Sequence, residues 1–187
     1  MKYLIAGLGN PGDEYAQTRH NIGFLILDAF AKASNISFSP GRYASQATVK
    51  FKGRSFILIK PTTFMNLSGK AVQYWMQQEK IPIENLLVVV DDLALPFGSL
   101  RMKGKGSDGS HNGLSSIHES LKSTDYPRLR FGIGSEFSRG RQVDYVLGEW
   151  SEEERKTLMA RIDLSVEMIK SFGTAGLGLT MTQFNNK

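Results

Sequence analysis

The side chains best suited to chemistry lie in loops that each follow an apolar stretch of the chain. The loops cover residues 7–21, 61–66, 91–95 and a glycine-rich segment, 104–113. Their candidate functional groups are one imidazole, one carboxylate and three amides: His20, Asp91 or Asp92, Asn10, Asn66 and Asn112. A carboxylate beside a histidine accepts a hydrogen bond from one ring nitrogen and favours the imidazolium that forms when the other nitrogen takes a proton. The set therefore predicts general-base chemistry.

Water is the expected nucleophile for this base. The sequence contains no cysteine, and its loop serines lack the G-x-S-x-G elbow of a serine hydrolase. A water molecule activated by His20 would attack a carbonyl carbon, while asparagine amides donate to the developing oxyanion or bind a peptide backbone. The competing interpretation is that His20 is a structural or surface histidine, which is the commoner role for a single histidine in a loop.

No cofactor or metal ion is expected in this site. The segment GLGNPG resembles a dinucleotide-binding fingerprint, but Pro11 would occupy the start of the phosphate-binding turn and Asp13 would face the pyrophosphate. The histidines His20, His111 and His118 lack the spacing of a helical zinc site. We therefore predict a site that works with protein side chains and water alone.

Apolar segments of regular period predict the elements that position these loops. Strands are expected at 2–6, 43–51, 55–59, 86–90, 99–103 and 128–134, the second and third forming a hairpin. Helices are expected at 22–33, 69–78, 114–121 and 151–172, the last beginning with a Ser151–Glu154 capping box. The predicted fold class is α/β, a single-domain three-layer α/β/α sandwich over residues 1–187 with a mixed, mostly parallel twisted sheet. The tail from about residue 173 is expected to be loosely ordered.

The loops meet at one edge of such a sheet, where open α/β sheets bind ligands, and basic residues are expected beside them. The formal net charge is +5, and many basic side chains fall in two segments that we expect to be neighbours: Arg101, Lys103 and Lys105, and Arg128, Arg130, Arg139 and Arg141. Such side chains grip phosphate oxygens, so the patch predicts a nucleic acid partner; the competing interpretation is a solvated charged face. No apolar run is long enough to span a membrane, and no signal peptide is evident.

Five segments along the chain carry a family resemblance: GLGNPGDEYAQTRHNIGF, KPTTFMNLSG, VVVDDLALPFGSLRMK, GSHNGLSSI and RLRFGIG. In this order, and over nearly the whole chain, they resemble bacterial peptidyl-tRNA hydrolase. The resemblance implies a monomeric, cytoplasmic, metal-free enzyme that hydrolyses the ester joining a peptide to the 3′ end of tRNA. The implied partner is peptidyl-tRNA, contacted at its acceptor stem, its 3′ end and its peptide.

The resemblance also implies roles for individual residues. His20 would be the catalytic base, Asp91 the acid that orients it, and Asn10 the amide that favours a blocked, peptide-like amine over a free one. The residues implied to line the substrate cleft, or to pack beside the base in the case of Met65, are Tyr15, Phe64, Met65, Asn66 and Asn112. The residues implied to clamp tRNA phosphates are Arg101, Lys103 and Arg130.

Two other functions are alternatives to this one. A non-catalytic RNA-binding member of the same fold, of the intron-splicing type, would keep the basic patch and lose hydrolysis. The intact set of His20, Asp91 and Asn10 argues against it. A small esterase with a substrate other than RNA would explain the base but leave the basic residues unexplained.

Overall fold

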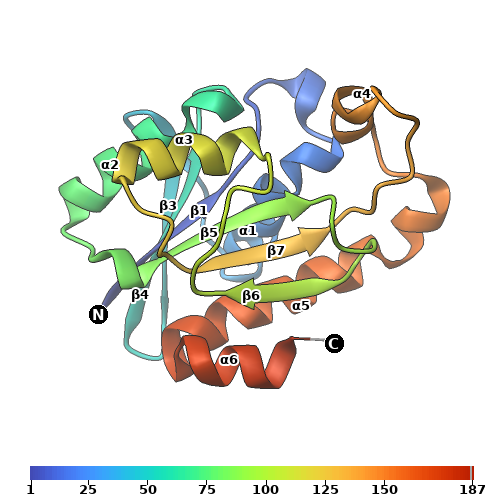
Figure 1. Cartoon of the computed structure of the whole chain (residues 1–187). Coiled ribbons are helices and arrows are strands. Elements are labelled where there is room, and N and C mark those ends of the chain that lie inside the picture. Colours follow the sequence, from blue (N-terminus) through green and yellow to red (C-terminus); the bar gives the residue numbers. More distant parts are fainter. Residues whose placement is uncertain (186) are drawn as a thin grey trace.

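The computed structural model describes residues 1–185 and 187, and its centre is a seven-stranded sheet (Figure 1). The strands are β1 (Lys2–Gly7), β2 (Ser39–Pro40), β3 (Ala44–Phe51), β4 (Arg54–Pro61), β5 (Leu86–Asp92), β6 (Leu100–Lys103) and β7 (Arg128–Gly132). Their order across the sheet is β2-β3-β4-β1-β5-β7-β6. The central strands β4, β1, β5 and β7 are parallel, whereas β3 and β6 pair antiparallel with their neighbours. The predicted mixed sheet is confirmed.

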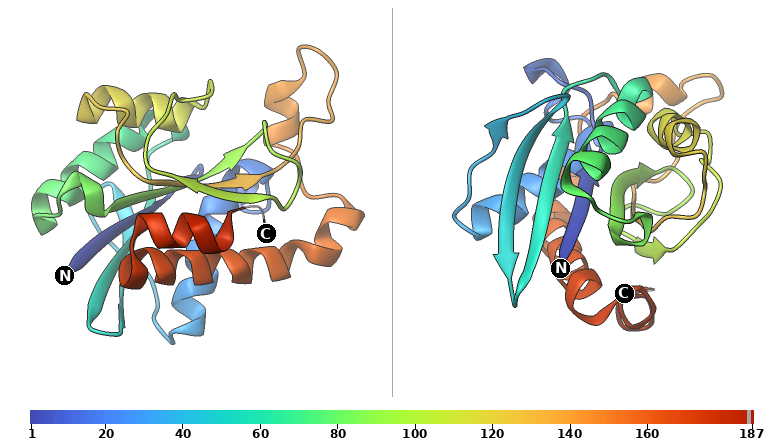
Figure 2. Two further views of the ribbon diagram at one scale, coloured as in Figure 1. Left: turned by 60° about the horizontal axis from the view of Figure 1, so that its bottom comes forward. Right: turned by 90° about the vertical axis from the view of Figure 1, so that its left-hand side faces the viewer.

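Helices cover both faces of this sheet. They are α1 (Ile22–Ala33), α2 (Ser68–Glu79), α3 (Asn112–Leu121), α4 (Gln142–Val146), α5 (Glu152–Ala175) and α6 (Leu177–Phe184). In the left view of Figure 2, α2 and α3 lie on one side of the sheet and α5 and α6 on the other. The expected three-layer arrangement is confirmed. Within the described residues, no helix combines the length and apolarity needed to cross a membrane.

The alternation of side chains along β1 explains the three layers. Tyr3 and Ile5 pack into a core with apolar residues of α1 and α5, whereas Leu4 and Ala6 belong to a second core with residues of α2 and α3. Successive side chains of a strand face opposite sides of the sheet, so a strand covered on both faces must be apolar throughout. The continuous apolar run 86–90, which forms most of β5, has the same origin.

Close packing between β1 and α1 sets the geometry at the carboxyl edge of the sheet. Gly7 and Gly23 allow this approach, because a Cβ on either residue would collide with backbone atoms of a neighbouring element. Just before α1, the chain makes a single 3-10 turn, Arg19–Asn21, that carries His20. The strand β5 lies directly beside β1 and ends at this edge with Asp91 as its penultimate residue. The fold therefore brings residues 20 and 91 together from distant parts of the chain.

The C-terminal segment differs from the expectation of a loosely ordered tail from about residue 173. Helix α5 continues to Ala175, and α6 follows it. Three apolar side chains of α6 pack against the core: Leu177, Met181 and Phe184. The Asn185 amide then pairs with both backbone groups of Met102 on β6, at 2.8 and 3.0 Å. This segment covers part of an edge strand whose backbone groups would otherwise face water.

Candidate active site

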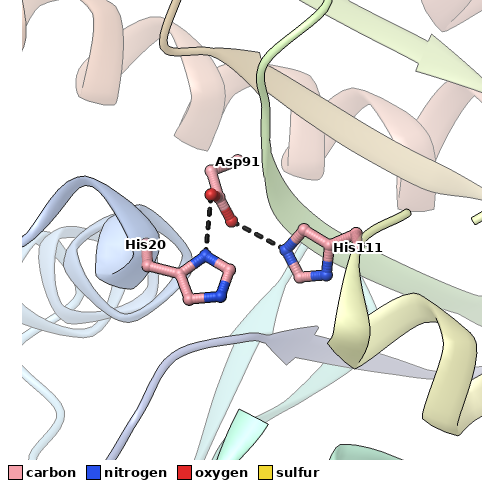
Figure 3. Close-up of side chains that lie close together, drawn as sticks. All are labelled: His20, Asp91 and His111. Atoms are coloured by element: carbon pink, nitrogen blue, oxygen red, sulfur yellow. Dashed lines mark hydrogen bonds and ion pairs between the residues drawn. The ribbon is translucent and has the colours of Figure 1, made fainter. Parts of the chain in front are cut away.

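A histidine and a carboxylate meet at the end of β5 (Figure 3). His20 Nδ1 lies 2.8 Å from Asp91 Oδ2. Asp91 is only 5% exposed, and the His20 side chain is partly buried. The choice between Asp91 and Asp92 is resolved by this contact, because Asp92 instead forms an ion pair with Arg130 at 3.2 Å.

A second histidine, His111, holds the other oxygen of the same carboxylate. His111 Nε2 lies 2.8 Å from Asp91 Oδ1. His111 is also the N-cap of α3, where its Nδ1 accepts hydrogen bonds from the backbone N–H groups of Gly113 and Leu114 at 3.1 and 3.4 Å. A nitrogen that accepts from amides carries no proton, so the proton of the neutral ring lies on Nε2 and is donated to Asp91. Sequence reasoning did not assign this role to His111.

Asp91 stays ionised although it is buried. Burial by itself would raise the pKa of the Asp91 carboxyl, but the two histidines that donate hydrogen bonds to it hold that pKa well below its usual range. Burial would lower the pKa of the His20 imidazole, but the Asp91 charge and the hydrogen bond to it raise this pKa above its ordinary value. The pair is thus arranged for His20 to take up a proton while Asp91 remains charged.

His20, Asp91 and His111 also lie close enough together to be considered as ligands of one metal ion. A metal bound at His111 Nε2 would need the lone pair of that nitrogen, and hence its proton moved to Nδ1. There the proton would collide with the two backbone N–H groups from which Nδ1 now accepts. The donor set therefore suits proton transfer better than metal ligation.

Asn10 lies in the loop after β1 with its amide orientation fixed. Its Oδ1 accepts a hydrogen bond of 2.7 Å from the backbone N–H of Met65, in the loop after β4. The oxygen is thereby identified, and the other amide atom, Nδ2, makes no hydrogen bond with any of the described residues. Asn10 is 9% exposed, so most of this side chain is buried while one donor remains available.

A cavity of about 520 Å³ opens beside the histidine pair. Its polar lining includes His20, Asp91, His111 and Asn112, together with Lys103 and Arg130. Phe137, Val143 and Val146, in and before α4, supply an apolar wall. The cavity thus joins the candidate base to the positive charges predicted to bind phosphate.

The sequence model of one protein family, described as peptidyl-tRNA hydrolase, matches residues 4–187. The chain belongs to the peptidyl-tRNA hydrolase family. A relative named peptidyl-tRNA hydrolase from Phocaeicola vulgatus is 61% identical over 187 residues, covering 100% of both chains. Another from Caldanaerobacter subterraneus is 45% identical over 184 residues, covering 98% of this chain and 99% of the relative.

A solved structure leads to the same conclusion about the fold. The crystal structure of peptidyl-tRNA hydrolase from Acinetobacter baumannii superposes with a TM-score of 0.92 at 33% identity, covering 98% of this chain and 94% of that one. The resemblance to the peptidyl-tRNA hydrolase family is therefore confirmed, and a non-catalytic RNA-binding protein of this fold is not supported.

Of the residues expected to line the substrate cleft, Asn112 lines the cavity beside the histidine pair, whereas Tyr15, Phe64, Met65 and Asn66 are not part of its walls. Tyr15 and Phe64 meet edge to face, with ring centroids 6.4 Å apart, and Phe64 is 55% exposed, which is high for an apolar side chain. Asn66 and Asn112 are exposed, one after β4 and the other at the start of α3. Met65 is buried, and its backbone N–H donates to Asn10 Oδ1.

The residues expected to clamp phosphates lie together on the β6–β7 pair. Lys103 and Arg130 line the cavity, and burial together with the charges of Arg130 and Arg128 lowers the pKa of the Lys103 ammonium. Arg101 pairs in register with Arg130 on the neighbouring strand. All three side chains are partly buried. The fold therefore groups them, although Arg130 already has Asp92 as a partner.

The expectation that Arg128 belongs to the accessible basic patch is wrong. Arg128 is fully buried and donates to backbone carbonyls of Gly106, Ser107 and Thr124 at 2.7 to 3.2 Å. Its guanidinium also lies over the Tyr126 ring, 4.2 Å from the ring centroid, which is within the range of a cation–π interaction. Arg128 thus anchors the glycine-rich segment that leads to His111.

Proposed function

We propose that this chain hydrolyses the ester bond between the peptide and the 3′ end of tRNA, with His20 as the general base. The observation that carries the proposal is the contact between His20 Nδ1 and Asp91, because it leaves His20 Nε2 as the proton acceptor. Membership of the peptidyl-tRNA hydrolase family supports the same reaction.

The reaction needs one proton to move twice. His20 Nε2 takes a proton from water as the water oxygen attacks the ester carbonyl carbon, and Asp91 stabilises the resulting imidazolium. The tetrahedral intermediate then collapses, the bond to the ribose oxygen breaks, and the imidazolium returns the proton to that oxygen. The products are free tRNA and the peptide carboxylic acid, which loses its proton to solvent at neutral pH. A positioned base of this kind accelerates such a step by about 10² to 10⁴.

Amides supply the recognition of the peptide. Asn10 is hydrogen-bonded to Asn21, the residue after the base, and its Nδ2 is an available donor that binds the carbonyl of a blocked amine. A free aminoacyl ester would bring a charged ammonium to this position, where a donor cannot pair with it. Asn66 and Asn112 bind other groups of the substrate, and Tyr15 and Phe64 pack against its peptide and terminal nucleoside.

Positive charge supplies the recognition of tRNA. Lys103 and Arg130 line the same cavity as His20, and Arg101 lies beside them. These residues bind phosphates of the acceptor stem. The enzyme acts as a monomer in the cytoplasm, where peptidyl-tRNA is released from ribosomes.

The experiment that tests this function compares two substrates. Release of the acyl group from N-acetyl-aminoacyl-tRNA is measured beside release from unacetylated aminoacyl-tRNA, with EDTA present. Cleavage of the acetylated substrate alone is the expected result. Tight tRNA binding with no cleavage of either substrate would instead favour the RNA-binding alternative, and cleavage unaffected by excess uncharged tRNA would favour a small esterase.

A further inference from the structure

Asn21 directly follows the candidate base His20, but its side chain makes no hydrogen bond to the described residues of the helix that it begins. It occupies the N-cap position of α1, where an asparagine side chain usually accepts from an amide of its own helix. Within the described residues, the Asn21 side chain makes no such bond. The residue is only 1% exposed, so its amide must find partners elsewhere.

Both partners belong to Asn10. Asn21 Oδ1 accepts from the Asn10 backbone N–H at 2.9 Å, and Asn21 Nδ2 donates to the Asn10 backbone carbonyl at 2.9 Å. The Asn21 side-chain amide thus bonds both backbone polar groups of Asn10. A neighbouring β-strand would satisfy the same two groups with its own backbone. A shorter or less complementary side chain cannot make both bonds together.

This pairing leaves Asn10 little freedom. Its backbone N–H and carbonyl are held by Asn21, and its Oδ1 accepts from the Met65 backbone. Gly9 fits the same arrangement, since a Cβ at that position would lie 3.0 Å from Asn21 Cγ. Three of the four polar groups of Asn10 are therefore fixed, and the fourth, Nδ2, is the one available to a ligand.

We propose that Asn21 is a positioning residue that aims the Asn10 amide at the acyl group of the substrate and so sets the preference for a blocked over a free amine. The inference rests on the proposed function. Asn21 directly follows His20 in the turn Arg19–Asn21, so one short segment positions both the base and the selecting amide.

The test measures selectivity rather than activity alone. In Asn21→Ala, the ratio of kcat/KM for N-acetyl-aminoacyl-tRNA over free aminoacyl-tRNA falls by about tenfold or more, because Asn10 is no longer held. The pH midpoint of N-acetyl-aminoacyl-tRNA hydrolysis stays that of the parent, since His20 and Asp91 are unchanged. Asn21→Ser, whose hydroxyl serves one of the two Asn10 groups, gives an intermediate ratio and leaves a smaller packing defect.

The matched control is Asn85→Ala. Asn85 also donates from its side chain to a backbone carbonyl, that of Lys2, but at the start of β1, away from the site. In Asn85→Ala, the ratio of kcat/KM for the acetylated over the free substrate remains that of the parent. An Asn10→Ala/Asn21→Ala double variant has the ratio of Asn10→Ala alone, because Asn21 acts through Asn10.

Two failures are distinguishable. If the parent cleaves neither substrate, the proposed function is wrong. If the parent discriminates and the folded Asn21 variants keep its ratio within about twofold, or their effect adds to that of Asn10→Ala, only the positioning role is wrong.

Discussion

His111 Nε2 lies 2.8 Å from Asp91 Oδ1, whereas His20 contacts the other oxygen of the same carboxylate, Oδ2. The contact is possible because His111 caps α3 through its other nitrogen, which fixes the proton on Nε2. The carboxylate that orients the base is therefore itself oriented by the start of a helix. The His111 imidazole therefore both stabilises the start of α3 and holds the carboxylate that orients His20.

His111→Ala is expected to lower kcat by about tenfold, because Asp91 loses one hydrogen bond of roughly 1.4 kcal/mol and can rotate away from His20. His111→Asn keeps a side chain able to cap α3 but too short to reach Asp91 from that position. Steady-state kinetics and urea unfolding of both variants separate the two roles. Full kcat in His111→Asn, with reduced stability only in His111→Ala, would restrict His111 to the role of a helix cap.

The pH dependence of hydrolysis should report the His20–Asp91 pair. His20 must be neutral to act as a base, so kcat/KM falls as the pH drops through its raised pKa, and the midpoint lies above the ordinary value of 6.5. In Asp91→Asn the raising charge is removed and burial remains, so the midpoint moves to lower pH while the plateau falls. A midpoint that is unchanged in Asp91→Asn would show that Asp91 does not set the pKa of the base.

Lys103→Ala and Arg130→Ala are expected to weaken tRNA binding and to reduce its salt dependence, with the log–log slope smaller by about 0.9 for each phosphate that is no longer neutralised. Fluorescence titrations with uncharged tRNA at several salt concentrations measure this slope. Lys52→Ala is the control, because Lys52 is exposed in the turn between β3 and β4, towards the opposite edge of the sheet. Slopes equal to that of the parent in all variants would contradict a phosphate role.

Arg128→Lys is expected to destabilise the protein by about 2 to 3 kcal/mol, because a lysine cannot reach the several carbonyls that the buried guanidinium satisfies. The same change at Arg130, two residues along the strand and partly exposed, should cost about 0 to 1 kcal/mol. Urea unfolding curves of the two variants provide the comparison. Equal losses of stability would mean that the anchoring of residues 104–110 contributes little to the folded state.

The positions of His20, Asp91 and Asn10 were predictable because each lies at the end of an apolar strand or in the loop that follows one, and parallel strands end at one edge. The burial of Arg128 was not, because a charged residue on an alternating strand resembles a surface residue until its partners in another loop are known. Helix α6 was missed because its segment is rich in glycine and threonine, and only the packing of Leu177, Met181 and Phe184 gives it order. The contact of His111 with Asp91 likewise depends on an interaction between residues far apart in the sequence.

The most direct test of the central claim is single-turnover hydrolysis of N-acetyl-aminoacyl-tRNA by His20→Ala, with the affinity for tRNA measured in parallel. General-base catalysis by His20 predicts a rate lower by about 10² or more, with a dissociation constant for tRNA within about twofold of the parent. An unchanged rate at saturating enzyme would contradict the assignment of His20 as the base.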